Sequence, residues 1–280
     1  MTPLAPRRAS RPLTLAGGVV VCLGLVGAGS ASGAPAPAIS GAVSATSSTV
    51  IEQSSARTLR STKPITSRVI GRSVRGRNIV ARLYGSKSSS RVAVIIGSMH
   101  GNETGGVPIA KRLEQISPPL GTALWVIRNL NPDGTKMHRR QNAHGVDLNR
   151  NGRDHWRSYA GGREYYPGKR AASEPETRAY IRFLNTVDPD VVLVYHQAGN
   201  AVDSYHQKNR GLTHGLADRM KLRVRSFACN GVCTGTLTGW FNTTHSGVAL
   251  TVELPRPVSM KAVKRGARAA RWAATYVPDR

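Results

Sequence analysis

Two histidines and a glutamate lie at or just after the ends of short apolar segments. His100 and Glu103 stand three positions apart and follow the apolar run 92–96, and His196 comes directly after the run 191–195. Open α/β sheets place their sites at the carboxyl ends of their strands, so we expect these side chains to meet. Two imidazole nitrogens and one carboxylate are a typical ligand set of catalytic zinc, with a fourth position left for water.

Each of these residues alone is weak support for a metal site. A histidine and a glutamate at this spacing also occur by chance, and motif matches carry that risk. Taken alone, His196 is more typical of a structural histidine whose ring nitrogens are satisfied in a core than of a metal ligand. The hypothesis therefore depends on the combination of two strand ends.

A further apolar run, 249–252, ends in Glu253, a carboxylate where an apolar residue would be expected. A buried acid is destabilising unless it is paired or functional. Zinc lowers the pKa of a water that it holds to about 7. A nearby glutamate can accept that water's proton and pass it to a leaving amine. The alternative role of Glu253 is a salt bridge to one of the many arginines.

Several motifs follow one another in a known order between about residues 66 and 277. They are Ile70–Ser73 with Gly76–Arg77, His100–Glu103, Asn131–Gly134, Arg140–Asn142, Gly145–Asn151, His196 and Glu253. With these motifs the sequence resembles the zinc carboxypeptidase family. Within that family it is similar to the bacterial murein peptide amidases, through Ser173–Thr177 and Asp147–Asn151.

The resemblance implies the centre of the site. His100, Glu103 and His196 would bind one Zn²⁺ ion. Glu253 would act as general base and then as general acid. Arg140 would polarise the scissile carbonyl and stabilise the oxyanion, a task that suits a guanidinium because it never loses its charge.

The resemblance also implies residues around this centre. Asn149 and Arg150 would bind a terminal carboxylate of the substrate, Arg150 through a bidentate pair. Asp147 would stand behind His100, where it fixes the histidine tautomer. Because Arg139 is adjacent to Arg140, the assignment of the polarising arginine stays open by one position.

Two departures from the family concern the substrate. Digestive members carry a substrate-contacting tyrosine in the segment before the catalytic glutamate, and residues 227–252 contain no tyrosine. The position that sets side-chain preference falls near Thr238. A small polar residue there suits a polar or zwitterionic side chain, such as that of diaminopimelate.

The N-terminal region is predicted to be an export signal followed by a linker. In residues 1–36, three arginines precede an apolar run of about 14 residues, shorter than the roughly 20 that a membrane span requires. Residues 37–63 are rich in Ser, Thr, Ala and Pro and have few large apolar residues, as linkers do. We therefore expect a secreted, cell-wall-associated protein with a peptidase domain over 64–280 and no stable membrane anchor.

Cys229 and Cys233 fit a small loop closed by a disulfide in an oxidising compartment. The alternative is a pair of free thiols.

The chain is strongly basic. Its 280 residues include 40 Lys and Arg against 15 Asp and Glu, a net charge of +25, of which +22 remains after the three leader arginines are removed. Such a charge indicates an anionic partner, which could be nucleic acid, a membrane surface or a wall polymer. Export and the scarcity of aromatic residues disfavour nucleic acid, which needs aromatic stacking platforms.

Strand and helix patterns alternate beyond residue 64. Strands are expected at 80–84, 92–96, 123–127, 191–195 and 248–252, and helices at 106–116, 174–187 and 258–277. Ser173 with Glu176 forms a capping-box signature at the start of the second helix. This alternation predicts an α/β fold with a mixed, mostly parallel central sheet flanked by helices. The resemblance implies the same zinc carboxypeptidase-like fold.

The expected function is that of an exported zinc metallopeptidase that hydrolyses a peptide bond in cell-wall peptides, with the γ-D-glutamyl-diaminopimelate bond as the favoured target. Three alternatives stay open: a general metallocarboxypeptidase, a zinc N-acyl-amino-acid deacylase, and a basic wall-binding module without activity. The expected partners are a peptidoglycan-derived peptide and an anionic wall polymer. The oligomeric state is not indicated.

Overall fold

The computed structural model describes residues 62–276, apart from 160, 206 and 229–232. These residues belong to one compact unit, Ala56–Arg280. The predicted leader at 1–36 and nearly all of the linker at 37–63 lie outside the described residues and stay predictions. None of the described helices combines the length and the apolarity that crossing a bilayer requires.

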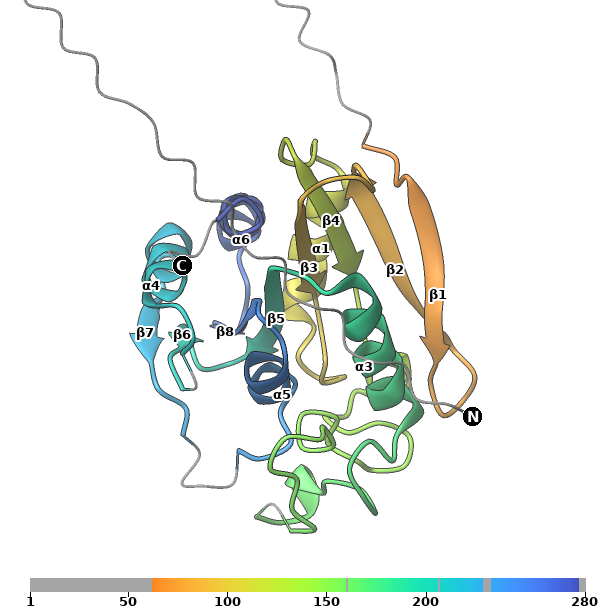
Figure 1. Ribbon diagram of the computed structural model, residues 1–280. Coiled ribbons are helices and arrows are strands. Elements are labelled where there is room, and N and C mark those ends of the chain that lie inside the picture. Colours follow the sequence, from red (N-terminus) through yellow and green to blue (C-terminus); the bar gives the residue numbers. More distant parts are fainter. Residues whose placement is uncertain (1–61, 160, 206, 229–232, 277–280) are drawn as a thin grey trace, which may run out of the picture. The chain divides into compact units, whose positions relative to one another are not determined.

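The centre of this unit is an eight-stranded mixed sheet in the order β1-β2-β4-β3-β5-β8-β6-β7 (Figure 1). Strands β4, β3, β5 and β8 are mutually parallel, and β1 pairs antiparallel with β2 and β2 with β4. Strand β6 pairs antiparallel with β8 and parallel with β7. The strands are β1 (Thr66–Arg72), β2 (Asn78–Gly85), β3 (Arg91–Ile96), β4 (Thr122–Ile127), β5 (Val191–Gln197), β6 (Ala201–Asp203), β7 (Arg223–Arg225) and β8 (Val248–Leu254).

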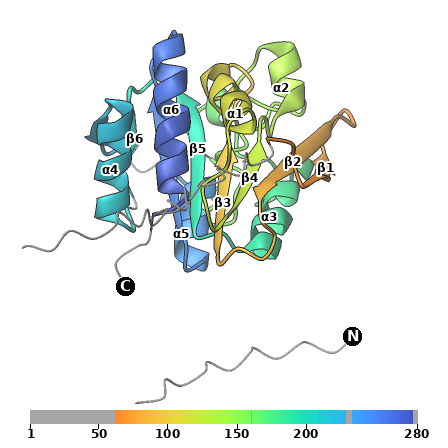
Figure 2. The same cartoon turned by 90° about the horizontal axis from the view of Figure 1, so that it is seen from above.

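Helices cover both faces of the sheet. Helices α1, α4 and α6 pack on one face, and α3 and α5 pack on the other (Figure 2). The helices are α1 (Val107–Glu114), α2 (Pro132–Met137), α3 (Pro175–Val187), α4 (Arg210–Met220), α5 (Leu237–Thr244) and α6 (Met260–Ala273). The fold class predicted from the sequence is confirmed.

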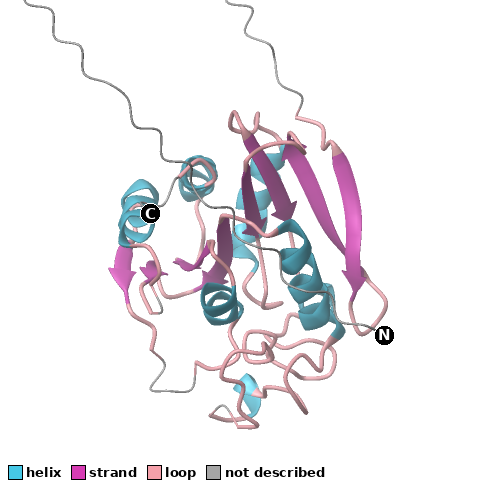
Figure 3. Ribbon diagram, viewed as in Figure 1, coloured by secondary structure: helices cyan, strands magenta, loops and turns pink. Residues whose placement is uncertain are grey.

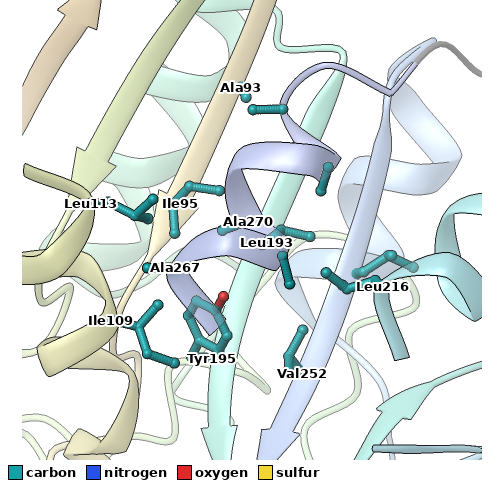
Figure 4. Close-up of a cluster of buried hydrophobic side chains, with 14 of the residues drawn as sticks. Ala93, Ile95, Ile109, Leu113, Leu193, Tyr195, Leu216, Val252, Ala267 and Ala270 are labelled. Atoms are coloured by element: carbon teal, nitrogen blue, oxygen red, sulfur yellow. The ribbon is translucent and has the colours of Figure 1, made fainter. Parts of the chain in front are cut away.

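The two faces carry separate hydrophobic cores because the central strands are apolar on both sides, as buried parallel strands are. Figure 4 shows part of the first core, where Ile95, Leu193 and Val252 face Ala267 and Ala270 of α6. The alanines let the basic helix α6 approach the sheet closely. Each fully buried aliphatic side chain contributes roughly 1.5–3 kcal/mol, so the parallel strands form a rigid base.

The sheet directs the ends of its parallel strands toward a group of long loops. Figure 3 shows these loops gathered at one end of the sheet, and the segment 138–174 supplies most of them. The site residues expected after β3, β5 and β8 lie at this end. Residues far apart in the sequence therefore lie close together at this end of the sheet.

All predicted strands and helices are present, with bounds shifted by a few residues. Six elements were not expected, namely β1, β6, β7, α2, α4 and α5. The capping-box prediction is wrong. Glu174 is the N-cap of α3 without a side-chain cap bond, and Ser173 donates to Glu174 Oε1 at 2.7 Å. Glu176 Oε1 instead accepts from Val74 N at 3.1 Å, so a tertiary contact takes the carboxylate.

We predict that Gly71→Ala destabilises the fold by about 1–3 kcal/mol, because added volume strains a close-packed contact. A Cβ at Gly71 of β1 would lie 2.5 Å from the Cβ of Ala179 in α3. Urea unfolding measures the change. The control is Ser67→Ala on the exposed side of β1, expected to change the free energy of unfolding by less than about 0.5 kcal/mol. Equal stability of Gly71→Ala and wild type would contradict the prediction.

We also predict a pH-dependent effect at Asp133, which is fully buried. Burial opposes its ionisation, but the hydrogen bond from Arg75 N at 2.9 Å and the ion pair with Arg77 outweigh burial and lower its pKa. The resulting stability is present above the unfolded-state pKa of about 3.9 and is lost as the pH falls through the folded-state pKa.

Asp133→Asn should therefore lower the free energy of unfolding by about 1–3 kcal/mol at pH 7. The difference from wild type should shrink as the pH approaches about 2.5. Denaturant melts at both pH values measure it. A loss of the same size at both would show that the carboxylate charge is not the cause.

Candidate active site

Three buried ligand atoms converge where β5 ends and the turn after β3 begins: His196 is the penultimate residue of β5, and His100 and Glu103 follow β3. Glu103 Oε2 lies 2.8 Å from His100 Nδ1 and 2.9 Å from His196 Nδ1, and the two Nδ1 atoms are 3.2 Å apart. Tetrahedral zinc with bonds of about 2.0–2.1 Å needs ligand atoms separated by roughly 3.3 Å. The residues fit one zinc ion, with small outward movements of the side chains.

The sheet register places Glu253 beside this cluster. His196 on β5 and Glu253 on β8 are direct neighbours in the parallel ladder. The Glu253 carboxylate is half-buried and accepts a hydrogen bond from Gly199 N at 3.1 Å. No described arginine forms a salt bridge with it, so the alternative role considered for Glu253 is not what the structure shows.

Asp147 lies behind His100, as the resemblance implied. His100 Nε2 is 2.9 Å from Asp147 Oδ1, and both side chains are buried. With Nδ1 facing the cluster and binding a metal ion, His100 would keep its proton on Nε2 and donate a hydrogen bond to Asp147. Burial disfavours charge on either group. For His100, the attraction of Asp147 and Glu103 outweighs burial and the opposing charge of Arg140, and it raises the pKa. For Asp147, the attraction of His100 and Arg140 outweighs burial and lowers the pKa well below its usual range.

Arg140 connects the metal ligand Glu103 with Asp147. Its Nη1 donates to Glu103 Oε1 at 2.9 Å, and its Nε donates to Asp147 Oδ2 at 3.0 Å. Burial lowers the pKa of the guanidinium, but the two carboxylates outweigh burial and raise it. Arg139, by contrast, is exposed and lines a different cavity. Of the two adjacent arginines, the structure brings Arg140 into the site.

Arg150 is a buried cation that faces the same cavity. Its Nη1 donates to the carbonyl of Asn149 at 2.8 Å, while its buried Nε has no hydrogen-bond partner among the described residues. Burial lowers its pKa, and the nearby Arg140 charge acts in the same direction. A guanidinium in this position is stabilised by an anion. Asn149 lines the cavity too, and its side-chain oxygen accepts from Leu237 N at 3.1 Å, which fixes the start of α5.

Close backbone packing holds the turn around His100 and the segment around Arg140 against helix α2. Asn131 caps α2 by accepting from Gly134 N at 2.8 Å, and its amide donates to the carbonyl of Arg140 at 3.2 Å. A Cβ on Gly101 would lie 2.0 Å from the carbonyl carbon of Gly134, so only glycine fits next to His100. The Asn131–Gly134 motif therefore positions the site without contacting the ligand cluster.

The site opens into a cavity of about 130 Å³. Besides the residues already described, its walls include the side chains of Asp203, Tyr205, Phe227, Thr236, Thr238 and Thr251. Thr238 was expected there, and its hydroxyl is 3.2 Å from that of Thr251. Asp203 was missed. Its Oδ1 accepts from Tyr205 N at 2.8 Å and from Phe227 N at 3.0 Å, which places a fixed carboxylate in the cavity wall.

The described residues do not test the predicted disulfide. Cys229 lies outside them. Cys233 lines the cavity, and Arg150 Nη2 donates to its Sγ at 3.5 Å. The Cys229–Cys233 pairing stays a prediction.

Comparison with known proteins agrees with this geometry. Residues 120–228 match the family model of the zinc carboxypeptidases. The matched part includes His196 and the Arg140–Arg150 segment, and it ends before Glu253. Murein peptide amidase A of Escherichia coli K12 is 31% identical over 140 residues, which are 45% of this chain and 57% of that protein. The human carboxypeptidase N catalytic chain is 26% identical over 184 residues, 52% of this chain and 40% of that one.

The chain thus spans just over half the length of the murein peptide amidase that it matches. Among solved structures, the murein-tripeptide amidase of E. coli O157 superposes with a TM-score of 0.63 at 24% identity, covering 80% of this chain and 98% of that one. Carboxypeptidase A of Helicoverpa armigera gives 0.62 at 18% identity, covering 76% and 70%. These matches confirm the resemblance seen in the motifs and show the zinc carboxypeptidase fold. The His-Glu-His cluster is consistent with one zinc ion.

We predict that Asp147→Asn weakens zinc binding by about 10–100-fold, because loss of a carboxylate behind a ligating histidine reduces its basicity. The asparagine keeps the shape of the side chain and one acceptor oxygen. Competition with a chromophoric chelator measures the affinity, with circular dichroism as a check on folding. Asp154→Asn, at a partly exposed acid outside the site, serves as the control. Equal zinc affinity of Asp147→Asn and wild type would contradict the role assigned to Asp147.

Proposed function

We propose that this chain, with a zinc carboxypeptidase sequence match and fold, is a zinc-dependent peptidase. The observation that carries the proposal is the convergence of His100 Nδ1, Glu103 Oε2 and His196 Nδ1, with Glu253 on the adjacent strand. A metal-ligand set next to a half-buried carboxylate is an arrangement that can hydrolyse an amide bond.

Glu253 is the proton carrier of the proposed reaction. Bound zinc supplies Lewis acidity and lowers the pKa of a water to near 7. Glu253 accepts a proton from the attacking water as the new C–O bond forms. It then delivers this proton to the leaving nitrogen as the C–N bond breaks. The hydrogen bond from Gly199 N holds its carboxylate at the strand end.

The two arginines of the site, Arg140 and Arg150, bind different parts of the substrate in this proposal. Arg140 stabilises the negative charge that develops on the scissile carbonyl oxygen, and its bonds to Glu103 and Asp147 hold it in place beforehand. Such preorganised charge costs no rearrangement during the reaction. Arg150, whose Nε has no partner among the described residues, pairs with a carboxylate on the leaving residue, and Asn149 assists it.

We further propose that the leaving residue is diaminopimelate in a wall-derived peptide. Asp203 places a fixed carboxylate in the cavity wall, suited to an ammonium group, and Thr238 adds a small polar surface. A diaminopimelate side chain ends in a carbon that carries both an amine and a carboxylate. The name of the related murein peptide amidase A supports the same substrate class. Export through the predicted leader and attraction of the basic chain to anionic wall polymer belong to this proposal.

The remaining alternatives are weighed by the same observations. The zinc carboxypeptidase match favours a peptidase over an N-acyl-amino-acid deacylase. The intact ligand geometry with Glu253 in register favours an enzyme over a binding module without activity. A general carboxypeptidase shares the same chemical centre, so the experiment must separate it by substrate.

We expect the zinc-loaded protein to cleave L-Ala-γ-D-Glu-diaminopimelate and release diaminopimelate. Glu253→Gln should retain zinc but lower kcat by about 10²–10⁴-fold, the usual contribution of general acid–base catalysis. Mass spectrometry identifies the products, and metal analysis confirms equal loading of the two proteins.

Two other results would change the proposal. Glu253-dependent removal of C-terminal residues from ordinary peptides, with the wall peptide left intact, would keep the zinc centre and discard the wall substrate. Absence of turnover on both classes, with salt-sensitive binding to wall fragments, would favour the binding module.

A further inference from the structure

The helices on one face of the sheet carry a concentration of positive charge. Helix α6 contributes five cationic residues, and its neighbours α1 and α4 contribute two each. Helices α3 and α5 on the opposite face contribute two, both in α3. Figure 2 shows α1, α6 and α4 side by side along the first face, with α6 in the middle. The excess of cations among the helices is therefore directional.

Three exposed cations form a stripe along α6. Lys261, Lys264 and Arg268 follow one another at spacings of three and four residues, which bring side chains to one side of a helix. At about 1.5 Å per residue the stripe is roughly 10 Å long. Mainly alanines form the buried side of α6, so the stripe faces away from the sheet. Lys111 and Arg112 of the neighbouring α1 are also exposed.

Few acids lie on these three helices. Helix α6 contains none, and α4 contains Asp218. The acid of α1, Glu114, is buried and pairs with Arg82 and Arg128, which belong to other segments. Within the described part of the chain, no carboxylate forms a salt bridge with the stripe on α6. Its charge is thus available to an external anion.

The start of α6 is fixed beside the ligand cluster. Arg256, in the segment between β8 and α6, donates from Nη2 to the carbonyl of Asn102 at 2.8 Å. A Cβ on Gly105 would lie 2.7 Å from a methyl carbon of Val258, so the two segments are in close contact. Glu103 lies between Asn102 and Gly105 in the same turn. The stripe therefore begins near the segment that supplies two of the candidate metal ligands.

The aromatic surface of this face is covered. Trp272 is the one Trp, Tyr or Phe residue in α1, α4 and α6. The guanidinium of Arg219 lies 3.8 Å from the centroid of its ring, and a Cβ on Gly215 would lie 2.4 Å from the ring edge. Proteins that bind single-stranded nucleic acids typically stack the bases on open aromatic rings. Positive charge without such rings fits a polyanion that has no bases.

We propose that the stripe on α6, with the exposed cations of α1, binds a linear phosphodiester polymer of the cell wall. Lysine ammonium groups are compact point charges that bind phosphate well. A flexible polymer with a charge in each repeat can meet successive cations along the helix. The inference deepens the attraction to wall polymer in the proposed function, and it rests on that function for the source of the polymer.

Polymer binding and peptide cleavage use separate surfaces in this proposal. None of the described residues that line the cavity at the ligand cluster belongs to α6. A bound polymer would leave this cavity open and hold the enzyme on the wall that contains its peptide substrate.

Binding of the zinc-loaded protein to soluble poly(glycerol phosphate), titrated at several salt concentrations, tests the proposal. The triple variant Lys261→Gln/Lys264→Gln/Arg268→Gln should bind about 10–100-fold more weakly at low salt, because three charge contacts are lost. The slope of log K against log salt concentration should become shallower by about 2–3, close to one for each cation. Circular dichroism checks the folding of the variant.

The matched control removes the same charge from other parts of the surface. Lys136→Gln/Lys169→Gln/Arg182→Gln also changes two lysines and one arginine, all exposed and outside α1, α4 and α6. Its affinity should stay within about threefold of wild type, because salt screens charges that do not touch the polymer. Equal weakening of the two triple variants, or no binding by wild type, would overturn the inference.

Single-stranded DNA and the wall tripeptide separate the other outcomes. Tighter binding of wild type to single-stranded DNA than to poly(glycerol phosphate) at equal salt would overturn the assigned partner. The α6 variant should cleave L-Ala-γ-D-Glu-diaminopimelate with the kcat/KM of wild type, and a lower value would show that α6 acts at the zinc site instead. If wild type binds the polymer through α6 but cleaves no wall peptide, the proposed function fails and the binding surface stands.

Discussion

The site depends on one buried carboxylate, that of Asp147. Its Oδ1 bonds His100 Nε2 and accepts from Asn149 N, and its Oδ2 accepts from Arg140. His100, Arg140 and the turn at Asn149, to which we assign metal binding, oxyanion stabilisation and carboxylate binding, are thereby fixed to a single group. Burying an unpaired carboxylate would cost several kcal/mol, so each of these contacts is needed to offset the loss of hydration. The hydrogen bonds that stabilise the buried Asp147 carboxylate are therefore the same ones that hold His100, Arg140 and Asn149 in the proposed site.

The parallel strands supply the second constraint. Adjacent strands in register carry His196 and Glu253 to the same height, about 4.7–4.9 Å apart across the ladder. His100 lies in the turn after β3 and not on the strand itself. The chain turns here so that the Glu103 carboxylate points back toward His100 and His196. The contact between Gly101 and Gly134 keeps that turn pressed onto α2. Rigid strands and tight glycine packing thus leave the ligand atoms little freedom to separate.

The sequence was informative where one local pattern decides the outcome. The long apolar strands and the three ligand positions are of this kind, since strand ends and residue types can be found without knowing the fold. Three-residue strands such as β6 and β7 carry no usable pattern, and the glycines within α4 lower its helix propensity. Asp203 was missed for this reason, because it ends the unrecognised β6. The capping box failed because Glu176 has a tertiary partner, Val74 N, which no local rule includes.

The described cationic side chains fall into two groups, many at the surface and a few in the candidate active site. Most of these cations are exposed and contribute to long-range attraction of anions. Arg150 is buried and Arg140 is partly buried, and they differ in partners. Arg140 is neutralised by two carboxylates of the protein, whereas no carboxylate of the described residues is a hydrogen-bond partner of Arg150. A substrate carboxylate would give the Arg150 guanidinium an anionic partner and offset the free energy lost when folding removed its hydration. A neutral group would not. The proposed selectivity for an anionic leaving residue would follow from this difference between the two arginines.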